Sequence, residues 1–511
     1  MLRRVSRSSL MVTKSACARS ESSCSTIISP RGNSSKSTLL YALPTTCDDM
    51  NVEMRIPVEI LSEIFYLLCD EPIALHILDN SSHFDKFPWA VGQVCRRWRM
   101  VFLSHPPLWT AISLRNPPQG NPSVSYLAEM IRRSAIYLKR SGQYPLTITI
   151  STNFRQTPTA ESPITTIWMM LLSYSNRWRK AVIVLPLAQS VIDDILLERR
   201  GRMPILESLS LCMSGLDEIP SFHDGFEIAP RLIELDLVLY DDTIGTWVFP
   251  WAQLTKLDLE TSYVKTGDFA SNELRSFLLQ LQKVEELRLT TRQFHNAHLA
   301  PFEFPPVRLT RLQFLEVSVA FSVVFSWIES PLLEHLSLPY DCGTFFDPVS
   351  CREGLSFLIG RSSCHIRKLT LKCRDDELAR NIMIALASVE ELYIENQKIA
   401  PCLVRVIANS NDIYLPNMQA LNVTSCPGGF EELVAELSCL LKVRSKGSVM
   451  TLSSRSIVPL ERLTIQIEWG DCDGACCQVF YDESRTLDSS LEVMSNWPLS
   501  MFIAIKARLG P

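Results

Sequence analysis

The phrase LxxLxL, with leucine or another apolar residue at its three fixed positions, recurs ten times between residues 204 and 465. Each phrase ends in alternating apolar and polar residues, as a β-strand with one buried face does. The second apolar position of the phrase is always leucine, at Leu209, Leu235, Leu257, Leu287, Leu315, Leu336, Leu369, Leu392, Leu421 and Leu463. Two weaker copies precede these, at residues 145–150 and 180–185. The chain is therefore expected to repeat one strand-containing unit.

The leucines of successive phrases are separated by about 28 residues on average, and segments with helical spacing lie between the phrases. These helical segments are 124–140, 272–281, 377–386, 403–408 and 430–441. A strand and a helix repeated ten to twelve times can bury their apolar faces only by stacking on neighbouring copies. An ordinary doubly wound α/β domain remains the alternative, because it too alternates strands and helices.

The phrase and its period resemble those of leucine-rich repeats, in an irregular form because the Asn or Cys that usually follows the phrase is mostly absent. The resemblance implies an α/β solenoid over residues 114–470, here called the repeat region. A parallel sheet would line its concave face and helices its convex face. Residues 471–511 are expected to form an atypical C-terminal cap, as terminal repeats do.

Residues 51–113, here called the helical unit, follow a different pattern. Pro57 stands where a helix would begin, and apolar residues then recur at steps of three and four. A second helix is expected from about residue 90 to 102, with arginines on one side and apolar residues on the other. Pro106 and Pro107 end it, and Leu108 and Trp109 follow as an apolar plug. A unit this small is expected to need support from the repeats or from a partner.

The strings IPVEILSEIF, VCRRWR and PPLW of the helical unit resemble the F-box, in the form common in fungal F-box proteins. The resemblance implies docking on a Skp-type adaptor, which joins a cullin in an SCF ubiquitin ligase. The positions that match the family's docking residues are Pro57, Ile60, Leu61, Ile64, Val94, Cys95 and Trp98. Two departures are Ile56, where leucine is usual, and a long spacer at residues 70–88. The alternative is a helical cap that only closes the repeats.

Bulk composition narrows the range of partners. A net charge of -5 and a pI near 6.0 argue against nucleic acid, which needs clustered positive charge. No apolar run reaches the about 18 residues that span a bilayer. Sixteen scattered cysteines without a secretory leader are typical of reduced thiols, so we expect a soluble cytoplasmic or nuclear protein. The Ser- and Arg-rich residues 1–50 are expected to be a disordered tail, with a mitochondrial transit peptide as the alternative.

The sequence contains no catalytic motif that we can identify. The string DCDGACC at residues 471–477 is the most metal-like, but no second Cys/His pair lies nearby and its spacing does not fit a calcium loop. We therefore expect neither a metal nor a cofactor, and no enzyme activity.

The polar position between the last two apolar residues of each phrase would face the concave side of a solenoid. The expected target-binding residues are Arg288, Glu316, Ser337, Thr370, Tyr393 and Asn422. Together these patterns favour a substrate-recognition subunit of an SCF-type ubiquitin ligase that binds an unidentified target protein. A repeat scaffold with a degenerate F-box is the second hypothesis, and an enzyme hidden in the α/β part is the third.

Overall fold

The computed structural model describes the chain in segments from Ile56 onward. The described residues are 56–68, 91–115, 124–151, 163–185, 202–213, 224–239, 244, 247–261, 268–291, 305–318, 321, 323–339, 348–372, 376–395, 400–408, 414–425, 430–444, 458, 460–468, 476–482 and 491–494. The chain divides into two units after Ile56, and the elements below belong to the second unit. The predicted tail at 1–50, the spacer at 70–88 and residues 471–475 lie outside the described residues.

One fifteen-stranded sheet runs through the second unit, with its strands in chain order. The first thirteen are parallel: β1 (Ala111–Arg115), β2 (Leu146–Ser151), β3 (Trp178–Leu185), β4 (Ser208–Met213), β5 (Glu234–Leu239), β6 (Lys256–Thr261), β7 (Glu286–Thr291), β9 (Phe314–Val317), β11 (His335–Leu338), β12 (Lys368–Leu371), β13 (Glu391–Ile394), β14 (Ala420–Ser425) and β15 (Arg462–Glu468). The last two, β16 (Cys476–Asp482) and β17 (Leu491–Met494), are antiparallel. This order confirms the predicted parallel sheet and agrees with the expected α/β solenoid.

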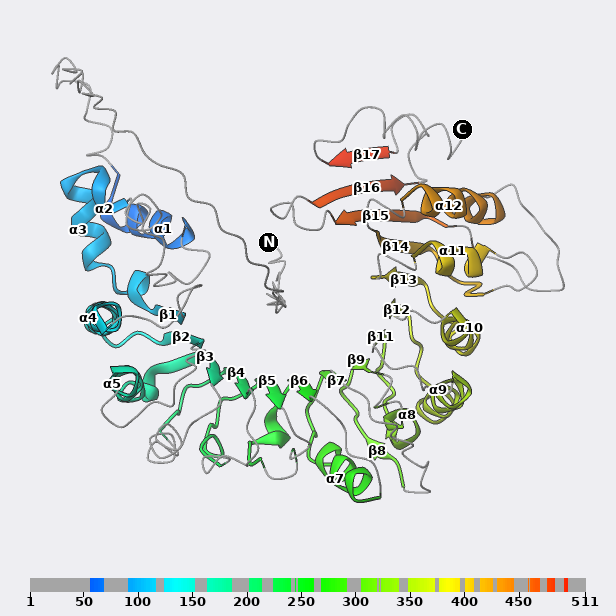
Figure 1. Ribbon diagram of the computed structural model, residues 1–511, viewed down its shortest axis with the longest axis horizontal. Helices are drawn as coiled ribbons and strands as arrows, with labels where there is room; N and C mark the ends of the chain where they lie inside the picture. Colours follow the sequence, from blue (N-terminus) through cyan, green and yellow to red (C-terminus); the bar gives the residue numbers. More distant parts are fainter. Residues whose placement is uncertain are drawn as a thin grey trace, which may run out of the picture. The chain divides into compact units, whose positions relative to one another are not determined.

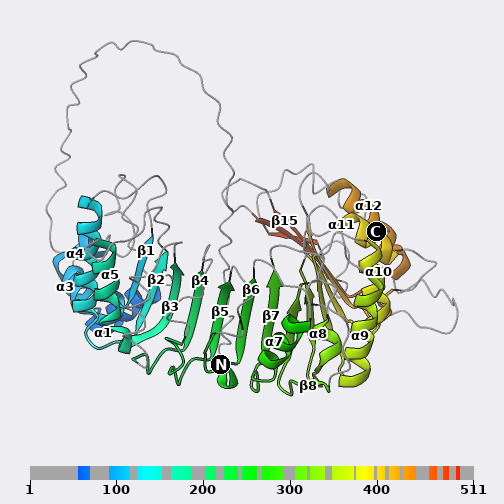
Figure 2. The same ribbon diagram turned by 60° about the horizontal axis from the view of Figure 1, so that its bottom comes forward.

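Helices cover one face of this sheet (Figures 1 and 2). They are α4 (Val124–Arg140), α5 (Pro163–Leu172), α7 (Asp268–Leu278), α9 (Pro348–Ser362), α10 (Asp376–Ala385), α11 (Ala400–Ala408) and α12 (Phe430–Arg444). None of these seven lies against the opposite face, which we call the helix-free face. The five predicted helical segments correspond to α4, α7, α10, α11 and α12, whereas α5 and α9 were not predicted. No described helix is long and apolar enough to cross a membrane.

The leucines of the ten phrases form one continuous ladder. Leu209 pairs with Leu235, that residue with Leu257, and so on along the sheet to Leu463. All ten are at most 1% exposed, so each lies in the core shared by neighbouring repeats. Burying such a side chain contributes about 1.5–3 kcal/mol, which makes the ladder the main apolar support of the sheet.

A second ladder, made of backbone groups, lies where the chain enters each strand. The carbonyl oxygen of Glu207 accepts hydrogen bonds from the N–H groups of Ile233 and Glu234, at 2.9 and 3.1 Å. The same double acceptance recurs in successive repeats as far as the carbonyl of Gln419, which accepts from the N–H groups of Glu461 and Arg462. The backbone itself thus joins one repeat to the next at this edge of the sheet.

Aromatic side chains take up the space beside β5 and β6, where the structure describes no long helix before α7. Phe249 stacks on Phe226 and Trp247 at 5.9 and 5.8 Å and meets Trp251 edge-on at 5.1 Å. Trp251, in the short helix η5 (Trp251–Gln253), then contacts Phe277 of α7 at 4.9 Å. All five are buried, so this aromatic cluster fills the helix side of the sheet there.

Short elements complete the described chain. A two-stranded parallel sheet pairs β8 (Val307–Arg308) with β10 (Ile328–Glu329), directly after the one-turn helix α8 (Val324–Trp327). The 3-10 turn η3 (Ser175–Arg177) leads into β3 and contains a buried arginine. The Arg177 guanidinium donates to the carbonyl of Tyr144 at 2.8 Å and to the hydroxyl of Ser141 at 2.7 Å, which ties two neighbouring repeats together.

The helical unit contains α1 (Val58–Leu68), α2 (Val91–Val94), α3 (Arg96–Ser104) and the 3-10 turn η2 (Pro106–Trp109). The helix predicted over residues 90–102 is wrong as a single element, because Cys95 interrupts it in an extended conformation. The Cys95 thiol accepts a hydrogen bond from the N–H of Trp98 at 3.4 Å and so caps the start of α3.

The predicted plug at the end of the helical unit is present. Trp109 is fully buried and donates from its indole N–H to the carbonyl of Phe102 at 3.1 Å. Strand β1 begins directly afterwards, across the predicted boundary between helical unit and repeat region, and was not itself predicted.

Candidate protein-interaction surfaces

Exposed apolar side chains concentrate on the helical unit. Eight of the sixteen large exposed apolar residues in the described chain belong to its three short helices. Ile60 and Ile64, one turn apart on α1, are 53% and 38% exposed, and Leu67 continues the same side of the helix. Val94 is 54% exposed on α2, and Met100 is exposed on α3. Such a concentration of apolar surface is typical of a protein-interaction site.

The predicted adaptor-binding residues fall into two groups. Pro57, Ile60, Ile64 and Val94 are exposed and can contact a partner. Leu61, Cys95 and Trp98 are buried or half-buried and shape the unit from inside.

Leu61 is 1% exposed and presents no surface to a partner, so we leave it out of the candidate surface. Trp98 is half-buried and packs edge-on against Phe65, with ring centroids 5.2 Å apart. Sequence reasoning missed Leu67, Met100 and Leu103, although the first lies one turn beyond Ile64 on the same helix side.

The six predicted target-binding residues lie on one row across the helix-free face. Register pairs Arg288 of β7 with Glu316 of β9, then continues through one position on each of four more strands to Asn422 of β14. We call this the central row, and it extends on the other side through Asp258 and Asp236 to Ser210. The structure therefore brings all six residues together.

Two residues of the central row are less accessible than the sequence suggested. Ser337 and Thr370 are only 2% and 5% exposed, so their short side chains lie below larger neighbours. The Thr370 hydroxyl is 3.0 Å from the ring nitrogen Nε2 of His335 on the adjacent strand. Neither offers a partner much surface.

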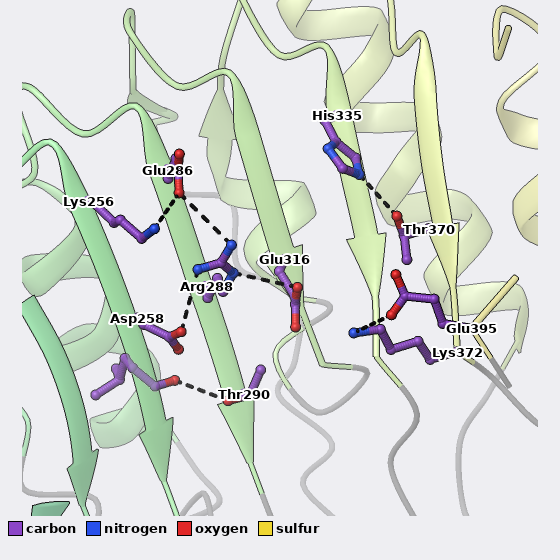
Figure 3. A network of polar contacts seen from close by, with 11 residues as sticks. Lys256, Asp258, Glu286, Arg288, Thr290, Glu316, His335, Thr370, Lys372 and Glu395 are labelled. Carbon is purple, nitrogen blue, oxygen red and sulfur yellow. Dashed lines mark hydrogen bonds and ion pairs between the residues drawn. The ribbon is translucent and has the colours of Figure 1, made fainter. Parts of the chain in front are cut away.

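Arg288 is the centre of a charged network on β6, β7 and β9 (Figure 3). Its guanidinium nitrogens lie 3.6 Å from Asp258, 3.7 Å from Glu316 and 3.9 Å from Glu286. Lys256 adds a fourth ion pair, 3.1 Å from Glu286. The network therefore shares two cations among three carboxylates.

Aromatic rings continue this network along the face. Arg288 lies over the ring of Phe314, 4.7 Å from its centroid, in a cation–π arrangement. Phe314 meets the His335 ring edge-on at 4.7 Å, and the centroid of Tyr393 lies 6.4 Å beyond. Burial, together with nearby Lys368, lowers the pKa of His335 to about 4, so this imidazole is neutral at physiological pH.

Two adjacent carboxylates of the central row carry perturbed pKa values. Burial, together with repulsion from Asp236, raises the pKa of Asp258 to about 6, although Arg288 opposes the rise. Burial also raises the pKa of Asp236, while the Ser210 hydroxyl, which donates to it at 2.8 Å, works in the other direction. Asp236 still keeps part of its surface in water, so this desolvation is partial. The sequence showed both residues in their phrases but did not single them out as a site.

Strands β12 to β15 carry charge in a more balanced way. Lys368 lies 3.1 Å from Glu391, and Lys372 lies 3.0 Å from Glu395. The Tyr393 hydroxyl donates to Glu391 at 2.9 Å, and Arg462 lies 3.5 Å from the same carboxylate. Burial opposes a lower pKa at Glu391, but the bonds from Lys368 and Tyr393 prevail and its pKa falls below the usual range.

Within the described residues, no group of three or more His, Cys, Asp or Glu side chains is arranged to hold a metal ion. The predicted absence of a metal site at residues 471–477 falls largely outside those residues, since only Cys476 and Cys477 belong to a described strand.

No protein-family model matches the chain, and no curated protein matches it either. Among solved structures, the chain is similar to the "Crystal structure of Rad7 and Elc1 complex in yeast", with 13% sequence identity and a TM-score of 0.26. The match covers 60% of this chain and 84% of that one. At this TM-score the likeness does not establish a shared fold or function.

Proposed function

We propose that this chain is the substrate-recognition subunit of an SCF-type ubiquitin ligase, acting in the cytoplasm or nucleus. The observation that carries the proposal is the exposed apolar face of the helical unit, formed by residues such as Ile60, Ile64 and Val94. A small helical unit that leaves such residues in water gains free energy when a partner covers them.

The adaptor-binding surface in this proposal consists of Pro57, Ile60, Ile64 and Val94, extended by exposed residues on α1 and α3. Its partner is a Skp-type adaptor, which the F-box-like strings imply, and a cullin would join through that adaptor. Leu61, Cys95 and Trp98 act indirectly, by holding the helices in place.

The target-binding surface in this proposal is the central row. A parallel sheet free of described helices on one face offers a rigid array of side chains, one from each strand. We propose no catalytic step for the chain itself. It would act by holding the target's lysines near the conjugating enzyme, so that rate comes from proximity.

One observation favours the second candidate, a non-ligase scaffold in which the helical unit only caps the repeats. Trp109 contacts the ring of Tyr137 on α4 at 4.9 Å, and the Arg140 guanidinium lies 4.4 Å from the Trp109 centroid. These contacts fasten the helical unit to the first repeat, as a cap requires. They leave its exposed apolar face unexplained, which is why we prefer the ligase proposal.

The test is a pull-down of full-length protein with a purified Skp-type adaptor. Ile60→Asp/Ile64→Asp is expected to abolish the interaction, since it places charge at the centre of the exposed face. Ile384→Asp is the matched control, because Ile384 is equally exposed, at 55%, but lies on α10 in the repeat region. If the wild-type protein binds no adaptor, or if the control loses binding equally, the ligase proposal fails and the scaffold remains.

A further inference from the structure

The helix-free face is unevenly charged. From β5 to β9 it carries six carboxylates against two cations, Lys256 and Arg288. The carboxylates are Glu234, Asp236, Asp258, Glu260, Glu286 and Glu316. Both cations are already engaged in ion pairs within the network. On β12 to β15, by contrast, each cation named above has a carboxylate partner.

The acidic excess is concentrated on β5. Glu234 and Asp236 lie two positions apart, so both point to the helix-free face. Lys256 of β6 stands directly opposite Glu234 in the register. Its ammonium group nevertheless lies 3.1 Å from Glu286 of β7, which flanks β6 on the side away from β5. In the described part of the chain neither Glu234 nor Asp236 forms an ion pair. The contact that Asp236 does make is the hydrogen bond from Ser210.

Arg288 shows how this face accommodates a cation. Its guanidinium lies between carboxylates on three strands and over the ring of Phe314. Guanidinium suits such a place because it is planar, always charged and able to stack on aromatic faces. On the neighbouring strands, Glu234 and Asp236 of β5 stand beside Asp258 of β6, and no ion pair of the network described here reaches either residue of β5.

We propose that the helix-free face over β5 and β6 docks a basic segment of the target protein. An arginine or lysine side chain of that segment would pair with Glu234 and Asp236, with Asp258 alongside. This inference rests on the proposed function, in which the helix-free face binds the target, and it adds the chemical class of the bound segment. Charge complementarity selects a basic segment, because an acidic one would be repelled by Glu234 and Asp236.

The test uses the full-length protein and a fluorescein-labelled peptide, (Arg-Gly-Ser)4, followed by fluorescence anisotropy. A matched peptide, (Glu-Gly-Ser)4, controls for nonspecific attachment. Glu234→Gln/Asp236→Asn removes two negative charges from the proposed site. Glu390→Gln/Glu395→Gln removes the same number from carboxylates that pair with Arg367 and Lys372.

Glu234→Gln/Asp236→Asn is expected to weaken binding of the arginine peptide by about five- to tenfold, as loss of two surface ion pairs implies. Glu390→Gln/Glu395→Gln is expected to stay within about twofold of the wild type. Wild-type affinity should fall steeply between about 50 and about 300 mM NaCl, since these carboxylates are at the surface. The glutamate peptide should not bind.

Three results overturn the proposal: equal affinity of the arginine peptide for all proteins, equal weakening by both double variants, or binding of the glutamate peptide.

A fourth overturning result would come from the chain's own basic tail, residues 1–50. If Arg3→Gln/Arg4→Gln/Arg7→Gln tightens peptide binding, that tail is the occupant of the face and the target is not. The adaptor pull-down gives a separate outcome. Protein that binds the arginine peptide as expected but binds no adaptor supports this docking site while the ligase proposal fails.

Discussion

The helical unit and the repeat region use the same apolar residue types in opposite ways. In the repeat region the ten ladder leucines are at most 1% exposed, and each pairs in register with the ladder leucine of a neighbouring strand. In the helical unit, Ile60 and Val94 are more than half exposed. An apolar residue in the repeats therefore stabilises the chain's own fold, whereas one on the helical unit's surface is available to stabilise a complex.

This difference explains why the two regions depend on each other. A repeat buries its faces against its neighbours, so the first repeat needs a cover at its open end. The helical unit supplies one through Trp109, which contacts Phe102 on its own side and Tyr137 on α4. Trp109 thus links the repeat region to the helical unit.

The largest effect is expected from Trp109→Ala, which removes that link. The free energy of unfolding should fall by about 4 kcal/mol, because a fully buried indole and its hydrogen bond to Phe102 are lost. Hydrogen exchange should quicken together in α3 and α4. Trp109→Phe is the conservative control and should cost about half as much. If exchange quickened in α3 alone, the helical unit would be attached independently of this contact.

A smaller effect is expected from Leu315→Ala, at the middle of the ladder. Leu315 is fully buried between Leu287 and Leu336, so its truncation should lower the free energy of unfolding by about 3 kcal/mol. Ile60→Ala, the comparison variant, should change it by less than about 0.5 kcal/mol, because that side chain is mostly in water. Urea denaturation of both variants measures the contrast. Equal losses would show that the helical unit's surface is part of the fold after all.

The repeat region was predictable because its signal lies within each repeat. One phrase specifies one strand, and the leucine at its second apolar position specifies the ladder, so ten strands followed from ten phrases. Strand β1 and helices α5 and α9 were missed, since their sequences lack the phrase or the helical spacing used to find the others. The break at Cys95 was missed because a thiol is an uncommon helix cap.

The candidate site was predictable in position but not in chemistry. Side-chain alternation along each strand placed Arg288, Glu316 and their neighbours on one face. Which of them would be accessible depends on residues from other repeats, such as the imidazole that bonds Thr370. The charge of the face has the same origin, since the repulsion between Asp236 and Asp258 arises only when β5 and β6 pair.

The smallest expected effect is on the pH dependence of stability. It concerns Asp258→Asn, a substitution in the central row of the helix-free face. The folded protein raises the pKa of Asp258 from 3.8 to about 6, so it binds this proton more tightly than the unfolded chain does. That contribution to stability is complete below pH 3.8 and is lost as pH rises through about 6. Asp258→Asn lacks this pH-dependent loss, so its free energy of unfolding relative to wild type should rise by about 1 kcal/mol as pH increases through this range. Solvent screening and the lost pair with Arg288 keep the difference this small. Urea unfolding across that pH range measures the difference, and parallel profiles for the two proteins would show that the carboxylate is not strained by its neighbours.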